Sequence, residues 1–167
     1  MKTADINSFS NVFEEIGKRW MLITAEKDGK VNTMTASWGG LGIMWGLPVA
    51  YVVIRPQRYT REFLDASDKF TASFYSEEYR PALNLCGVKS GRDCDKIAEA
   101  GLTTVRSDNG FTWFEQADDV LCLKKLYVQQ FEESSFIYPE IHKANYPKKD
   151  FHFLYIGEIE EYMTKTL

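Results

Sequence analysis

Three short segments carry polar and basic side chains whose spacing suits an anionic ligand with a flat ring. Residues 32–38 (Asn-Thr-Met-Thr-Ala-Ser-Trp) can hydrogen-bond the edge of a heterocycle while an apolar side chain covers its face. Residues 55–60 (Arg-Pro-Gln-Arg-Tyr-Thr) place two arginines and a hydroxyl at an expected helix start, which suits a phosphate monoester. Residues 86–96 gather three cations and a serine around two glycines, and this local positive charge stands out in an acidic chain.

Each of the three segments also has an ordinary structural interpretation. The first can be a strand with alternating threonines, the second a solvated basic turn, and the third an exposed loop.

Several standard signatures are missing from the sequence. The glycines of residues 40–46 read GxGxxxG rather than the dinucleotide motif GxGxxG, and no phosphate loop or GxSxG elbow occurs. His142 and His152 are the two histidines and lie ten residues apart, which excludes HExxH, and the cysteines form no CxxC pair. We therefore predict no metal site and disfavour Rossmann, P-loop and covalent hydrolytic chemistry.

The composition indicates one globular domain over residues 1–167. A net charge of −4 argues against a nucleic-acid partner. The uncharged run of residues 41–54 is too short and too interrupted by glycine and proline to span a membrane as a helix, so no membrane partner is predicted. The chain begins without the apolar stretch of a secretory signal, and its three cysteines make an odd number, so we expect free thiols and a cytoplasmic location.

Hydrophobic periodicity predicts a chain made mainly of strands. A short amphipathic helix over residues 6–16 is expected first, with Ser8 as its cap and Gly17 as its end. Asp28-Gly29 then predicts a hairpin turn. We expect strands at 20–26, 31–37, 49–55, 70–75, 120–131 and 151–162, and short helices at 60–66, 80–86 and 95–100. Residues 132–150, rich in Tyr, Pro and Lys, favour no regular element and are interpreted as a lid or a dimer arm. The fold class is an antiparallel β-barrel decorated by short helices.

Three segments resemble, in order and approximate spacing, the flavin reductase-like family of FMN-binding split barrels, in the branch that includes flavoredoxin. They are Met34–Trp38, Ile54–Thr60 and Cys86–Asp93 with the following Asp95-Lys96. His152–Ile159 resembles the family's closing strand, so the resemblance spans about residues 18–160. It implies a mainly β split barrel of antiparallel Greek-key type with short helices. It also implies a homodimer that holds FMN, without a covalent bond, at the subunit interface.

Carried over residue by residue, the resemblance places residues 32–38 along the isoalloxazine ring. Arg55, Arg58 and Thr60 would lie near the ribityl phosphate. His152 matches a histidine that faces the working side of the flavin in some relatives, where it positions nicotinamide or donates a proton; a histidine satisfied in the barrel wall is the alternative. Ser73 stands where relatives often carry an asparagine. The implied cofactor-binding residues are Asn32, Thr33, Met34, Thr35, Ala36, Ser37, Trp38, Arg55, Arg58, Tyr59, Thr60, Ser73, Cys86, Gly87, Lys89, Ser90, Arg92 and Lys96, with His152 as the candidate catalytic residue.

The function implied by the resemblance is an FMN oxidoreductase that passes electrons from NADH or NADPH to an acceptor. One alternative is a flavoredoxin-like carrier that receives electrons from a redox protein partner and does not oxidise a nicotinamide itself. Two further alternatives are an oxidase of a phosphorylated vitamin such as pyridoxamine phosphate, and a barrel that has lost its flavin and serves as an interaction domain.

Overall fold

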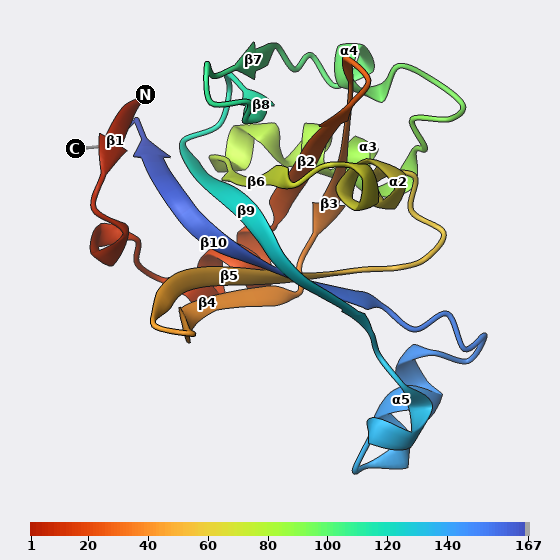
Figure 1. The fold of residues 1–167 in the computed structure, drawn as a ribbon. Coiled ribbons are helices and arrows are strands. Elements are labelled where there is room, and N and C mark those ends of the chain that lie inside the picture. The colour runs from red at the N-terminus through yellow and green to blue at the C-terminus, as the bar shows by residue number, and fades with distance from the viewer. Residues whose placement is uncertain (166–167) are drawn as a thin grey trace.

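An antiparallel sheet of eight strands dominates the described chain (Figure 1). The computed structural model describes residues 1–165, so residues 166 and 167 of the predicted 1–167 domain lie outside it. Strand order is β3-β2-β6-β9-β10-β5-β4, with β1 paired to β10, and β7 and β8 form a separate pair. The strands are β1 (Lys2–Ala4), β2 (Met21–Lys27), β3 (Lys30–Ala36), β4 (Gly39–Met44), β5 (Leu47–Ile54), β6 (Lys69–Phe74), β7 (Thr104–Arg106), β8 (Thr112–Phe114), β9 (Asp119–Gln130) and β10 (Phe153–Thr164).

The sheet curls without closing. β3 and β4 end the strand order, and no ladder joins them among the described residues. All pairings are antiparallel. The predicted fold class, a mainly β antiparallel split barrel with short helices, is therefore confirmed.

The helical elements are short. α2 and α3 pack against β2 and β3, while α5 stands away from the body on the long ends of β9 and β10 (Figure 1). No helix among residues 1–165 is long and apolar enough to cross a membrane. The helical elements are η1 (Ile6–Ser8), α1 (Val12–Glu14), the π-helical η2 (Glu15–Arg19), α2 (Thr60–Ala66), η3 (Glu77–Tyr79), α3 (Arg80–Val88), α4 (Lys96–Glu99), η4 (Glu133–Ser135) and α5 (Pro139–Asn145).

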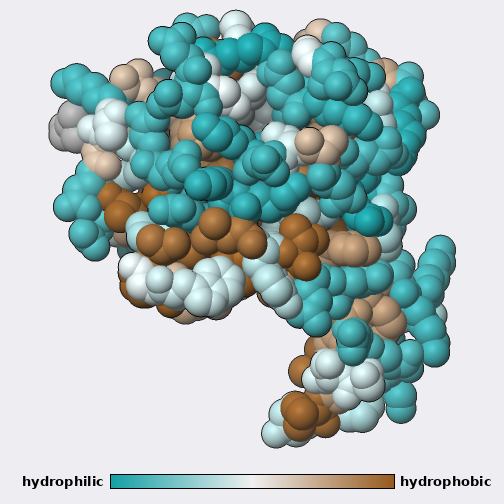
Figure 2. All heavy atoms as spheres, in the orientation of Figure 1, coloured by the Kyte–Doolittle hydropathy of each residue, from teal (hydrophilic) through white to brown (hydrophobic). Residues whose placement is uncertain are grey.

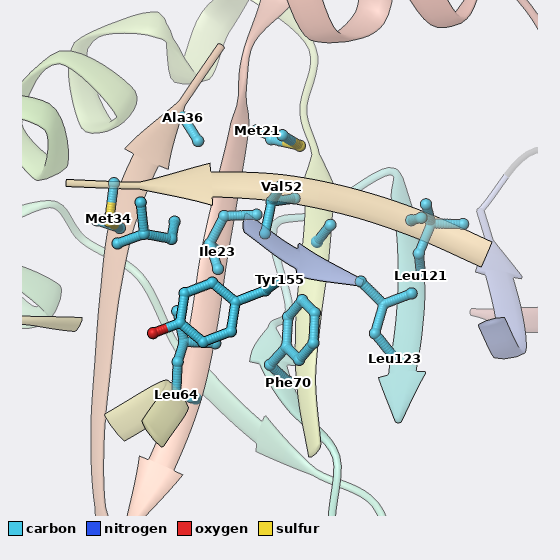
Figure 3. Close-up of a cluster of buried hydrophobic side chains, with 14 of the residues drawn as sticks. Met21, Ile23, Met34, Ala36, Val52, Leu64, Phe70, Leu121, Leu123 and Tyr155 are labelled. Atoms are coloured by element: carbon cyan, nitrogen blue, oxygen red, sulfur yellow. The ribbon is translucent and has the colours of Figure 1, made fainter. Parts of the chain in front are cut away.

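The two faces of the curled sheet bury two apolar clusters. Successive side chains of a strand point to opposite faces, so Ile23 joins the cluster inside the curl while Leu22 joins the cluster beneath α3. Figure 3 shows the inner cluster, where Phe70 and Tyr155 lie between strands. Burial of both faces explains why β2 begins with the uninterrupted apolar run of residues 21–23 and why the polar side chains of β6, Thr71 and Ser73, are buried as well. The rigid sheet that results positions the ends of β3 and β5.

Two tight hairpins use left-handed backbone conformations. Asp28 and Gly29 have φ of 51° and 76° and connect β2 to β3, which confirms the predicted hairpin. Trp45 and Gly46 have φ of 54° and 74° and connect β4 to β5 in the same way. The sequence analysis missed β4 because glycines interrupt its apolar pattern.

Three local predictions are wrong in detail. The single opening helix is divided into η1, α1 and η2, because Asn11 adopts a left-handed conformation with φ of 57° and breaks the run. Gly17 lies within η2 rather than ending a helix. α3 continues through Gly87 to Val88 instead of ending at residue 86. α4 lies within the predicted range of 95–100, and Asp95 caps it, because its carboxylate accepts from the Ala98 N–H.

The stretch between β9 and β10, residues 131–152, contains more regular structure than expected. Within it η4 and α5 form a projecting unit, which we call the arm. α5 begins with Pro139 in its first turn, a position where the missing N–H is harmless. The arm ends next to His152, so it enters the description of the site below.

Candidate functional site

A hollow of about 250 Å³ opens where β3 ends beside the loop after β5. We call it the β3 cavity. Eight of the residues expected to bind FMN or to act in catalysis line it, together with Val53, which the sequence analysis did not name. The cavity therefore joins segments that lie far apart in sequence. The expected residues are Met34, Thr35, Ala36, Ser37, Trp38, Arg55, Arg58 and His152.

Arg58 bridges the β3 cavity and the end of α3. Its Nη1 donates to the Gly87 carbonyl at 2.6 Å, and its Nη2 donates to the Cys86 carbonyl at 3.2 Å. These carbonyls belong to the last turn of α3, where backbone acceptors lack helical partners and the helix dipole favours a cation. Burial lowers the pKa of Arg58, which shows that the surroundings offset little of its charge.

Lys96 reaches the same helix end from α4. Its Nζ donates to the Lys89 carbonyl at 3.1 Å and contacts the Cys86 carbonyl at 3.4 Å. The pKa of Lys96 is lowered to about 8, mainly because the side chain is buried and also because the charge of Arg58 lies near. Burial also raises the pKa of Cys86 to about 11, so its thiol is neutral and balances neither cation. Within residues 1–165, Arg58 and Lys96 form no ion pair with a carboxylate.

A second hollow lies on the other side of this helix end, between α4 and the β2–β3 turn. We call it the α4 hollow; its volume is about 600 Å³. Asn32, Arg92 and Lys96 line it, so the expected cofactor residues are divided between two neighbouring spaces. Because Asn32 donates to the Thr60 hydroxyl at 2.9 Å, β3 is tied to the first turn of α2. The Gly91 backbone packs so closely on Asn32 that a Cβ there would lie 2.2 Å from Oδ1.

Other expected residues belong to the partition between the two hollows. The Tyr59 ring lies under the Arg92 guanidinium, 4.6 Å from centroid to Cζ, and Arg92 also pairs with Glu62. The Ser90 hydroxyl accepts from the Arg92 N–H, and the Lys89 ammonium pairs with Glu99. These groups hold the 86–96 loop against α2 and α4.

Two expected residues point away from the β3 cavity. The Thr33 hydroxyl donates to the Ile23 carbonyl and lies 2.9 Å from the Thr24 hydroxyl inside the sheet. Ser73 is fully buried in β6, on the face opposite to Ala72 and Phe74, so it belongs to the space under α3. Among residues 1–165 no three His, Cys, Asp or Glu side chains gather in a way that would hold a metal ion.

The base of the arm holds two residues of the β3 cavity wall, Arg55 and His152, in place. Arg55 donates from Nη1 to the Asp150 carboxylate at 2.6 Å and from Nη2 to the Asn145 carbonyl at 2.9 Å. The hydrogen bond from Arg55 lowers the pKa of Asp150, so this pair is ionised on both sides. The Tyr146 hydroxyl lies 2.8 Å from Nδ1 of His152. Sequence reasoning missed Asp150 and Tyr146; the aromatic residues of the stretch just before His152 were the available signal.

His152 is held in a neutral form by its surroundings. Its side chain is 7% exposed and its ring lies 5.2 Å from the Trp38 ring, centroid to centroid. The pKa of His152 is lowered to about 4, mainly by burial and to a smaller extent by the Arg55 charge, while Asp150 opposes this decrease. The imidazole is therefore uncharged at neutral pH, which makes it a hydrogen-bonding group rather than a proton donor.

The sequence from residue 13 to residue 166 matches the model of the flavin reductase-like domain. The chain belongs to the flavin reductase-like family. This is a family of FMN-binding oxidoreductases, and the match extends over most of the chain. No curated protein matches the sequence.

Solved structures of family members share this fold at low sequence identity. A flavin reductase-like enzyme with an FMN-binding domain from Shewanella baltica has a TM-score of 0.72 at 17% identity, over 99% of this chain and 77% of the other. Flavoredoxin of Desulfovibrio vulgaris has a TM-score of 0.69 at 22% identity, over 99% and 78%. The Streptomyces globisporus NADH:FAD oxidoreductase, solved with NAD and FAD fragments, has a TM-score of 0.63 at 14% identity, over 87% and 73%.

The donor set of this chain fits FMN. The β3 cavity offers hydroxyls, backbone N–H groups and the Trp38 ring to a flat heterocycle. Next to it, the half-buried Arg58 and the buried Lys96 carry positive charge without a carboxylate partner in the described chain. A phosphate monoester would provide the anionic partner that these two cations lack in the described chain.

Proposed function

We propose that this protein is an FMN-dependent oxidoreductase that takes electrons from NADH or NADPH and passes them to an acceptor. The observation that carries the proposal is a pair of cations, the half-buried Arg58 and the buried Lys96, which meet at the end of α3 beside the β3 cavity. Buried charge without a partner is costly, so this arrangement favours a bound anion. A flavin ring would occupy the β3 cavity, and its phosphate would balance the two cations at the end of α3.

Each wall of the site has a role in this proposal. Residues 34–38 would hydrogen-bond the ring, and Arg58, supported by Lys96, would hold the phosphate. Trp38 and His152 would shield the ring from water at the arm side. When bound, FMN supplies the redox chemistry, which no side chain of the protein performs. The remaining expected residues, among them Thr60 and Arg92, keep the surrounding loops in place.

A homodimer is part of the proposal. Apolar side chains are exposed along β4, β5 and the outer half of β9, and others lie at the tip of the arm (Figure 2). Contiguous apolar surface of this kind favours contact with a partner protein. A second copy of the chain covers both regions if flavin is held between subunits. The exposed residues are Ile43, Met44, Trp45, Tyr51, Leu126, Tyr127, Val128, Ile137, Tyr138 and Ile141. Analytical ultracentrifugation is expected to give twice the mass of one chain; a monomer at micromolar concentration contradicts the dimer.

The three free cysteines favour a reducing compartment. Cys86 and Cys122 are buried and Cys94 is partly exposed. Disulfides are rare where thiols are kept reduced, so we propose the cytoplasm as the site of activity.

The visible absorption spectrum of freshly purified protein, with mass identification of the released chromophore, tests the cofactor. We expect a yellow protein that releases FMN. Anaerobic stopped-flow mixing with NADH and with NADPH then tests the donor, and we expect the flavin absorbance to bleach with one or both. A colourless protein that does not take up added FMN contradicts the whole proposal. A flavin that stays oxidised with both nicotinamides contradicts only the reductase step.

An FMN carrier that receives electrons from a redox protein is the second candidate. The arm favours it, because it closes one wall of the β3 cavity through Arg55 and carries exposed Ile137 and Tyr138 towards a partner. The two functions differ in the stopped-flow experiment. Flavin that is reduced by a reduced iron–sulfur or flavin protein and ignores both nicotinamides supports the carrier.

A further inference from the structure

Tyr146 and His152 form a buried pair at the base of the arm. Their side chains are 4% and 7% exposed, and Tyr146 Oη lies 2.8 Å from His152 Nδ1. The Tyr146 ring packs against Phe151 at 5.0 Å between centroids and under the Arg55 guanidinium at 5.2 Å. The backbone of His152 is also fixed, because its carbonyl accepts from the Phe131 N–H. Both rings are therefore held in one orientation.

The contact allows two arrangements, and in one of them the tyrosine donates to the imidazole. Within residues 1–165, Nδ1 of His152 is the one hydrogen-bond partner of the Tyr146 hydroxyl, so it is the acceptor that the described chain offers to this O–H. Burial raises the pKa of Tyr146, which keeps the phenol protonated. An imidazole that accepts at Nδ1 carries its proton on Nε2 when it is neutral.

The opposite edge of the imidazole is the one available to a ligand. His152 lines the β3 cavity, and no hydrogen bond to its Nε2 is formed by the described part of the chain. Trp38 lies against the same ring and limits its rotation. The N–H on Nε2 is thus left for a group inside the cavity.

We propose that Tyr146 is a positioning residue, which holds His152 in the Nε2–H tautomer and so presents a fixed, neutral hydrogen-bond donor to a carbonyl-type acceptor in the β3 cavity. A ring carbonyl of a flavin and the carboxamide oxygen of a nicotinamide both have this chemistry. This identification of the ligand rests on the function proposed above. The proposed tautomer of His152 is independent of that function.

NMR of the flavin-free protein tests the tautomer directly. Long-range ¹H–¹⁵N spectra separate pyrrole-type from pyridine-type ring nitrogens, and the chain has only two histidines, so His142 serves as an internal reference. We expect His152 to show a pyrrole-type Nε2 and a pyridine-type Nδ1 from pH 8 to pH 5. A proton on Nδ1, or a fully protonated ring at pH 6, overturns the proposal, and this measurement requires no variant.

The Y146F variant removes the hydroxyl and keeps the ring. We expect its His152 to populate both tautomers and to titrate closer to pH 6.5, while Y79F, a matched change at a half-buried tyrosine of η3 that lines neither hollow, leaves His152 unchanged. An unchanged His152 in a folded Y146F protein overturns the role of Tyr146. Should Y146F fail to fold, the wild-type spectra still decide the tautomer.

Kinetics separate this proposal from the proposed function. In Y146F we expect flavin reduction by the nicotinamide to slow about fivefold while the Kd for FMN changes less than about twofold, as for loss of one oriented neutral hydrogen bond. Y79F is expected to match the wild type. If the wild-type flavin is not reduced by either nicotinamide, the reductase function fails and the tautomer result stands. A normal reduction rate in Y146F with a disordered tautomer contradicts a role in positioning the ligand.

Discussion

Arg55 and Arg58 lie three residues apart and line the same cavity, but different parts of the molecule hold them. Arg58 donates to carbonyls at the end of α3, which belongs to the body, and no carboxylate of the described chain pairs with it. Arg55 pairs with Asp150 and donates to Asn145, both in the arm. Charge is therefore balanced on the arm side of the cavity and unbalanced on the body side.

The difference shows where an anion binds best. A phosphate at Arg55 would have to compete with the Asp150 carboxylate, whereas a phosphate at Arg58 would meet no carboxylate of the described chain, and the Lys96 cation lies nearby beside the partly negative carbonyls of α3. In the proposed function the body side would supply binding energy, and the arm side would supply orientation through Tyr146 and His152. Each prediction below tests one side of this division.

The largest expected effect comes from R58A. Removing two charge-assisted hydrogen bonds to buried carbonyls is expected to lower the free energy of unfolding by about 3–4 kcal/mol and to weaken FMN binding about 100-fold. The R55A variant is expected to weaken FMN binding only about threefold, because Asp150 already neutralises Arg55. Urea unfolding and FMN titration measure both quantities, with R106A, an exposed arginine paired to Glu26, as the control for stability. A larger loss of FMN affinity in R55A than in R58A contradicts the conclusion that Arg58, rather than Arg55, holds the anion.

Acidification is expected to have the next largest effect, through His152. The folded pKa is about 4 and the ordinary value is 6.5, so between these values the unfolded chain binds a proton that the folded chain does not. Stability therefore falls as the pH drops from 6.5 to 4, by at most about 3 kcal/mol, and this contribution levels off below pH 4. Denaturant unfolding at several pH values measures it. The H152Q variant is expected to flatten this part of the curve, and H142Q is expected to leave it unchanged; equal slopes for wild type and H152Q contradict the assignment.

The D150N variant is expected to weaken the attachment of the arm. Without the carboxylate, Arg55 loses its ion pair, and the one remaining acceptor oxygen is neutral, so the arm opens more often and limited proteolysis within residues 131–150 is expected to be several-fold faster. Because Arg55 is freed, FMN affinity is expected to rise about threefold. The D108N variant, at an exposed loop position, is the control for both measurements. Unchanged cleavage with weaker FMN binding contradicts the proposed competition.

R92A is expected to have the smallest effect. Arg92 lies on the rim of the α4 hollow and pairs with Glu62, and both side chains are about half exposed. Its removal is expected to change the free energy of unfolding by less than about 0.5 kcal/mol and FMN affinity by about twofold to fivefold. A loss of affinity as large as that of R58A assigns the phosphate to the α4 hollow instead of the end of α3, which FMN titration of the two variants distinguishes.

The sequence predicted those features of the protein that depend on neighbouring residues. Alternation of apolar residues indicated β2, β3, β6, β9 and β10, and Asp28-Gly29 indicated a turn, because both depend on neighbouring residues only. The segments expected to bind the ligand were also identified by local chemistry, and most of those residues line the β3 cavity or the α4 hollow. The β4–β5 hairpin was not predicted, because the glycines of β4 interrupt the strand periodicity.

Contacts across long sequence separations were decided by the tertiary structure alone. Arg55 and Asp150 are 95 positions apart, and nothing in either segment indicates that they pair. The same holds for the point where Arg58 and Lys96 meet at the carbonyls of α3. Local patterns determine strands and turns, whereas the packing of the sheet determines which remote side chains share a wall, because burial and charge depend on every segment that surrounds a group. The sequence therefore determined the parts of the site, and the fold decided which arginine remains free to hold an anion.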